Sequence, residues 1–70
     1  MALPIAAIKY KLRSIYPNYK FEIKQKAKER LIVINVFFKG KDLGYREFIP
    51  ETSMDDFWAT IREWMRTLIR

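Results

Sequence analysis

The 70-residue sequence contains no cysteine and no histidine, and these two absences exclude much of the chemistry that small proteins perform. Without cysteine there is no disulfide framework, no thiolate zinc site and no thiol nucleophile. Without histidine the chain lacks the usual general base and the commonest ligand of transition metals. We therefore predict a protein that is not an enzyme and that binds no metal and no cofactor.

Long apolar runs, repeats and low-complexity segments are also missing. The longest uninterrupted apolar stretch is LPIAAI at residues 3–8, whereas a membrane-spanning helix needs about 20 such residues. This stretch also lacks the basic flank of a signal peptide. The sequence therefore predicts a cytoplasmic protein without a membrane partner, folded as one domain over residues 1–70.

What the chain does have is positive charge, and this charge is concentrated in one segment. The formal net charge is +6, and the window from Lys9 to Arg30 holds eight basic residues against two acidic ones. Outside this window basic and acidic residues number six each. Such a local excess favours a polyanionic partner, and the alternative is a basic surface that only keeps the protein soluble.

The first helix is predicted within MALPIAAIKYKLRSIYP, residues 1–17. Its apolar residues recur at the spacing of one helical face, namely Ile5, Ile8, Leu12 and Ile15. Pro17 disfavours helical backbone at the preceding residue and ends the helix. Lys9 and Arg13 flank the apolar stripe on one side. Tyr10 points away from the stripe, so this helix offers a basic surface with a ring that can stack on a nucleic-acid base.

The segment YKFEIKQKAK, residues 19–28, alternates between two kinds of side chain. Tyr19, Phe21 and Ile23 fall on one face, and the other face carries Lys20, Glu22, Lys24, Lys26 and Lys28. This period of two predicts a half-buried strand whose lysines either line the open face of a sheet or protect a sheet edge. Alternate residues are about 6.6 Å apart along a strand, close to the phosphate repeat of a nucleic-acid strand.

The segment RLIVINVFFK, residues 30–39, is predicted to be the central strand because β-branched and aromatic residues dominate it. We assign Ile32, Ile34, Val36 and Phe38 to the face that the helices cover. The opposite face carries Leu31, Val33 and Phe37, which lack an evident cover. These three residues predict a homodimer seam or another partner surface.

KGKDLG, residues 39–44, is interpreted as a turn, because it does not match the phosphate-binding loop pattern. YREFI, residues 45–49, then predicts a third short strand that Pro50 ends. In the last segment, residues 51–70, Thr52 or Ser53 is placed to cap a helix. Two acidic residues follow at 55 and 56, and we interpret them as capping and dipole-compensating residues. Both tryptophans fall within the apolar stripe of this helix and are assigned to the core.

The predicted order of elements is therefore α-β-β-β-α. Short connections favour a three-stranded antiparallel sheet with both helices packed on one face, an α+β fold. This order is similar to that of double-stranded-RNA-binding domains. Those domains carry a lysine cluster at the start of the last helix, where this chain has SMDDF, so the resemblance is limited to element order.

The sequence thus predicts a small non-enzymatic module that binds the DNA or RNA backbone. The predicted phosphate contacts are Lys9, Arg13, Lys20, Lys24, Lys26 and Lys28, with Tyr10 as a stacking residue. The alternative is a protein-interaction module, such as a small phage- or plasmid-type inhibitor or adaptor, that docks its basic face or its open sheet face on an acidic protein.

Overall fold

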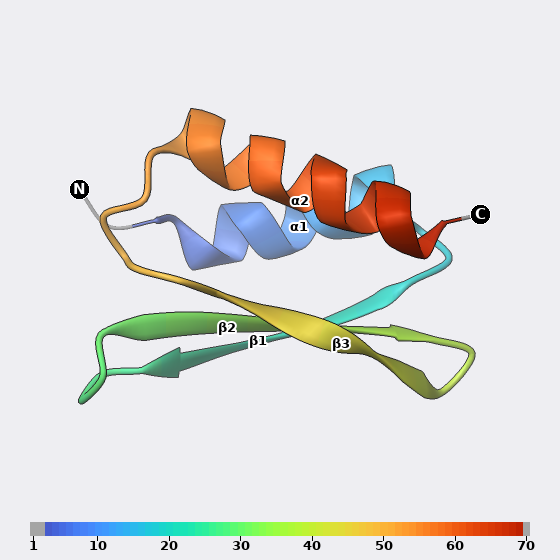
Figure 1. Ribbon diagram of the computed structural model, residues 1–70, viewed down its shortest axis with the longest axis horizontal. Helices are drawn as coiled ribbons and strands as arrows, with labels where there is room; N and C mark the ends of the chain where they lie inside the picture. The colour runs from blue at the N-terminus through green and yellow to red at the C-terminus, as the bar shows by residue number, and fades with distance from the viewer. Residues whose placement is uncertain (1–2, 70) are drawn as a thin grey trace.

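The computed structural model describes residues 3–69, so Met1, Ala2 and Arg70 of the two predicted helices lie outside the described residues. The elements are α1 (Ile5–Ile15), β1 (Lys20–Lys26), β2 (Leu31–Phe38), β3 (Lys41–Phe48) and α2 (Met54–Leu68). The strands form one antiparallel sheet in the order β1-β2-β3. Both helices lie on the same side of this sheet (Figure 1). The predicted α+β fold is confirmed.

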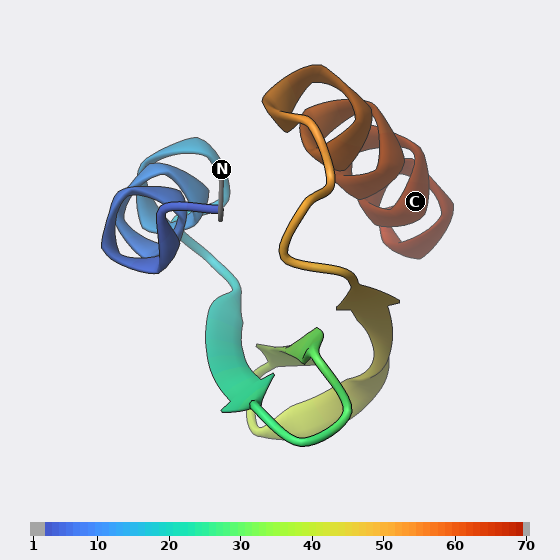
Figure 2. The ribbon, with the colours of Figure 1, turned by 90° about the vertical axis from the view of Figure 1, so that its left-hand side faces the viewer.

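Viewed end-on, α1 lies over the β1 side of the sheet and α2 over the β3 side (Figure 2). The helices and the sheet enclose one apolar core. The sheet contributes the buried residues Phe21, Ile32, Ile34, Val36 and Phe48, and the helices contribute Ile8, Leu12, Phe57, Ile61, Trp64 and Met65. Every second residue of β2 from Ile32 to Val36 enters this core, as a strand with a period of two requires. The assignment of β2 residues to the helix-covered core is therefore confirmed for Ile32, Ile34 and Val36, whereas Phe38 is only half-buried at the end of the strand, where it packs against Tyr19.

The prediction for Ile15 is wrong. The helical spacing predicts that Ile15 belongs to the buried stripe, whereas it is 48% exposed in the structure. The helix ends at this residue, and Tyr16 follows as its C-cap. The ring of Tyr16 packs against Phe21, with 6.1 Å between the ring centroids. The aromatic residue therefore covers the end of the core, and Ile15 stays at the surface.

The start of α2 follows the predicted capping pattern and selects Ser53 over Thr52. The Ser53 hydroxyl oxygen accepts a hydrogen bond from the Asp56 backbone N–H at 3.1 Å. Thr52 instead donates its hydroxyl to the Ile49 carbonyl oxygen at 2.8 Å. Asp55 and Asp56 lie in the first turn, where the positive end of the helix dipole favours carboxylates.

The predicted first strand extends too far at its C-terminal end, because Lys28 lies outside β1 in the structure. β1 ends at Lys26, and residues 27–30 form the turn into β2. The Arg30 N–H donates to the Ala27 carbonyl oxygen at 3.2 Å, and Arg30 adopts a φ of 52°. Lys26 pairs with Leu31, so the chain must reverse over residues 27–30 for β2 to run antiparallel to β1. The alternation of side chains therefore stops two residues earlier than predicted.

The predicted turn over residues 39–44 is also wrong in part, because only Lys39 and Gly40 connect β2 to β3. The two strands stay paired beyond this turn through an irregular step at Leu43, which has no partner in the register. The side chain of Asn35 secures this bulge, donating to the Gly44 carbonyl oxygen at 2.7 Å and to Asp42 Oδ1 at 2.9 Å. The polar residue that interrupts the apolar sequence of β2 therefore has a structural role in the sheet.

Candidate functional site

A groove runs between α1 and the outer edge of β1, which is an edge strand of the sheet. Its volume is about 650 Å³. The residues that line it are Lys9 and Arg13 of α1, Tyr19 before β1, and Lys20, Phe21, Glu22, Ile23 and Lys24 of β1. We call this feature the α1/β1 groove. It brings together four of the six cations that the sequence predicted as phosphate contacts.

The four cations form two rows along the groove. Lys9 and Arg13 are separated by four residues on α1, a rise of about 6 Å along the helix axis. Lys20 and Lys24 are separated by four residues on β1, or about 13 Å along the strand. The helix and the strand lie side by side, α1 above β1 (Figure 2). The two rows therefore border one groove at the edge of the sheet, while the strand alternation also places Lys20 and Lys24 on the face that the helices do not cover.

No internal ion pair neutralises these four cations within residues 3–69. The ion pairs in this part of the chain join Arg30 to Glu51 and Arg66 to Glu63. The only carboxylate that lines the α1/β1 groove is Glu22. The groove therefore has an excess of positive charge that is available to a ligand.

The groove on the opposite edge of the sheet provides a comparison. It lies between β3 and α2, has a volume of about 470 Å³ and is lined by Arg46, Ala59, Thr60, Glu63, Trp64 and Thr67. Here one cation is balanced by one carboxylate. The excess of positive charge therefore distinguishes the α1/β1 groove from a surface groove of similar size in the same fold.

Three other predicted contacts lie elsewhere. Lys26 lines a hollow on the open face of the sheet, and Lys28 lies in the turn after β1. Tyr10 is 78% exposed on α1 and does not line the groove. The structure thus divides the predicted basic surface into a groove and separate peripheral positions.

The open face of the sheet, which the helices do not cover, carries the three predicted interface residues. Leu31, Val33 and Phe37 are each half-buried by their neighbours on the sheet. Tyr45, which pairs with Asn35 in the register, lies on this face and is 55% exposed. A hollow of about 220 Å³ extends over all three strands and is lined by Glu22, Lys24, Lys26, Val33, Asn35, Tyr45 and Glu47.

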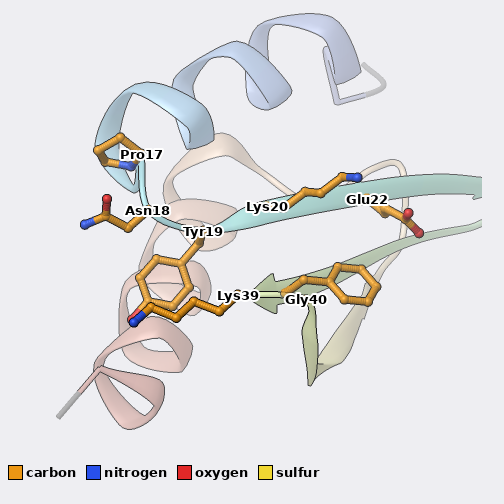
Figure 3. Close-up of a pocket in the computed structure, with 8 residues that line it drawn as sticks. Pro17, Asn18, Tyr19, Lys20, Glu22, Lys39 and Gly40 are labelled. Carbon is orange, nitrogen blue, oxygen red and sulfur yellow. The ribbon is translucent and has the colours of Figure 1, made fainter.

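A further hollow of about 410 Å³ lies at the end of the sheet where the β2–β3 turn meets the segment before β1. Its lining residues are Pro17, Asn18, Tyr19, Lys20, Glu22, Phe37, Lys39 and Gly40. The side chains of Tyr19 and Lys39 lie next to each other there, whereas Lys20 extends away along β1 (Figure 3). Tyr19 also packs on Phe38 with 4.9 Å between ring centroids. Tyr19 therefore has a packing role in addition to lining the groove.

Both tryptophans have structural roles. Trp64 is buried in the core, and Trp58 packs partly buried against it. The guanidinium of Arg46 lies 4.9 Å from the Trp64 ring centroid, and the Lys11 ammonium lies 4.8 Å from that of Trp58. These cation–π contacts use the ring faces for contacts within the protein. Trp58 and Trp64 therefore do not form an aromatic cage for a ligand.

Between residues 3 and 69 we find no group of three or more carboxylates that could hold a metal ion. In the same part of the chain, no helix has both the length and the apolar character to cross a membrane. Comparison with protein-family models, with curated proteins and with solved structures gave no significant match. The function is therefore inferred from the geometry of the site itself.

Proposed function

We propose that the protein is a small non-enzymatic module that binds the phosphate backbone of DNA or RNA in the α1/β1 groove. The observation that carries this proposal is the meeting of Lys9, Arg13, Lys20 and Lys24 around one groove with a single carboxylate among them. Cations grouped along a channel attract a polyanion and release its condensed counterions on binding. The function therefore rests on charge placed by the fold, and not on any catalytic group.

Binding of this kind has little dependence on sequence. Lysine and arginine contacts to phosphates position a protein on nucleic acid without reading the bases. Tyr10 is exposed and does not line the groove, so it is not needed for such contacts. We therefore expect similar affinities for unrelated sequences of equal length and strandedness.

The test is a salt titration of binding to labelled DNA and RNA, both duplex and single-stranded. Four phosphate contacts give a decrease of about 3.6 log units in the duplex binding constant for each tenfold rise in salt. Lys9→Gln/Arg13→Gln removes the α1 row, which should reduce that slope by about 1.8. By the same relation, the affinity of this variant at about 0.1 M salt should fall roughly 60-fold.

A matched control separates the groove from the net charge of the protein. Lys41→Gln/Arg62→Gln removes the same number of charges from exposed positions that do not line the groove. This control should keep a slope close to that of the parent protein. If both variants lose the same slope, binding depends on net charge and the proposed site is wrong.

The absence of any binding would reject the nucleic-acid proposal itself. If the parent protein binds none of the four nucleic acids at about 50 mM salt, the phosphate contacts do not form. The acidic-protein alternative would then take its place, because an acidic segment is attracted by the same unpaired cations. Capture of one protein in stoichiometric amount, lost in Lys9→Gln/Arg13→Gln, would identify that partner.

A further inference from the structure

The open face of the sheet carries opposite charges along its two sides. On the β1 side the strand alternation places Lys20, Lys24 and Lys26 on this face, together with Glu22. On the β3 side Asp42 and Glu47 pair with β2 residues of the open face. Three cations and three carboxylates therefore leave this face without net charge. Three of these residues, Lys20, Glu22 and Lys24, lie on the edge strand and also line the α1/β1 groove.

The register places these charges opposite one another across the apolar centre. Lys24 and Glu47 both pair with Val33, one from each side. Lys20 and Asp42 flank Phe37 in the same way. Two strand spacings separate the backbones within each pair by about 9.6 Å, so the charges of one copy do not neutralise each other directly. No ion pair joins β1 to β3 within residues 3–69.

We propose that the open face binds a second copy of this chain, with a two-fold axis parallel to β2. Rotation about this axis places β1 of one copy over β3 of the other. Lys24 then faces the partner's Glu47, and Lys20 faces the partner's Asp42. Val33 and Phe37 lie near the axis and meet their own counterparts, which covers the apolar strip that the helices leave open.

The charges favour this arrangement over the other two-fold packing of the same face. An axis perpendicular to the strands would place β1 over β1, so lysines would face lysines and carboxylates would face carboxylates. Like charges brought together in an interface disfavour the complex. Packed sheets cross at about 30°, which displaces the strand ends but keeps the central pairs in register. The Lys24 and Glu47 pair lies nearer the middle of β2 than the Lys20 and Asp42 pair does, and is the better test position.

The size of the face predicts weak association. Eight residues give a strand length of about 26 Å, and three strands give a width of about 14 Å. The flat area is then about 370 Å² for each copy, less than half of the roughly 800 Å² that each partner contributes to a standard interface. We therefore expect a dimer that forms in the range of about 10 µM to about 1 mM protein.

The test measures sedimentation of nuclease-treated protein over this concentration range, without nucleic acid. The parent should shift from monomer to dimer, and Lys24→Glu should raise the dissociation constant about tenfold or more, because two symmetry-related pairs become repulsive. Lys24→Glu/Glu47→Lys exchanges the two charges and should restore the parent dissociation constant to within about threefold. All these positions are exposed, so the monomer fold should be retained.

Restoration by the exchanged pair is specific to the proposed axis. A parent that stays monomeric at about 1 mM overturns the proposal, and so does an exchanged variant that remains as weak as Lys24→Glu. Lys9→Gln/Arg13→Gln should dimerise like the parent, since both residues lie on α1, away from the open face. This variant separates the two proposals: loss of nucleic-acid binding with intact dimerisation shows that the dimer does not need the α1 row, although Lys20 and Lys24 belong to both surfaces.

Discussion

Two valines of β2 allow a direct test of which face of the sheet forms the core. Val36 is fully buried on the helix-covered face, whereas Val33 lies half-buried on the open face. Replacing either one by alanine removes the same two methyl groups from the same strand. The loss of β-propensity is therefore similar in both variants, and the difference between them reports burial.

The cost of Val36→Ala can be estimated from its burial. Two methyl groups at about 0.8 kcal/mol each give about 1.6 kcal/mol of lost transfer free energy. A residual cavity of about 40 Å³ adds about 1 kcal/mol. The expected cost of about 2.6 kcal/mol is a large fraction of the roughly 4 to 10 kcal/mol typical for a chain of this size. Val33→Ala should cost about 1 kcal/mol or less, because its side chain remains partly hydrated.

Urea denaturation followed by circular dichroism at low micromolar protein measures both values without dimer formation. In thermal melts Val36→Ala should lower Tm by about 10 to 20 °C, since each kcal/mol shifts a domain of this size by about 4 to 8 °C. If Val33→Ala is as destabilising as Val36→Ala under these conditions, the helices do not cover the face described above and the core assignment is refuted.

Substitutions at three further positions test local features. Ser53→Ala should destabilise the protein by about 1 kcal/mol through loss of the cap on α2, whereas Ser53→Gly should cost only a few tenths, as urea midpoints would resolve. Gly44→Ala should cost about 1 to 3 kcal/mol because of its φ of 121° alone, since an added Cβ would meet nothing within 4 Å; an unchanged stability would contradict the bulge geometry. Arg30→Ala should change the unfolding free energy by about 0.5 kcal/mol or less, because its ion pair with Glu51 is exposed; a larger loss would mean that the pair orders the adjacent loops.

Most of the fold could be predicted from the sequence because the local patterns agree with one another. The alternation over Lys20–Lys26 predicts a strand with one buried face. The spacing of Ile8 and Leu12 predicts a helix with one buried face. The turn and bulge around Gly44 could not be predicted in this way. They depend on Asn35, a residue of another strand whose side chain satisfies the irregular backbone of β3.

The candidate site was predictable only in part, for a similar reason. The sequence places Lys9 and Arg13 on a helix and Lys20 and Lys24 on a strand, but their meeting depends on α1 packing over the β1 side of the sheet. The sequence pattern does not reveal the acidic side of the open face, because KGKDLG predicts a turn that includes Asp42, whereas Asp42 lies in β3. The alternation of Tyr45 and Glu47 with Arg46 and Phe48 was the available signal for that face.

The cation–π contacts of the two tryptophans also bear on how folding can be observed. Trp58 meets Lys11 of α1, so its surroundings change when the two helices come together. Trp64 meets Arg46 of β3, so it responds to the docking of α2 on the sheet. The contact of Lys11 with Trp58 joins residues that are much farther apart in the sequence than Arg46 and Trp64 are. Closing the longer segment between them costs more conformational entropy. Fluorescence of Trp58→Phe and Trp64→Phe would therefore follow two docking steps separately, using reporters already present in the chain.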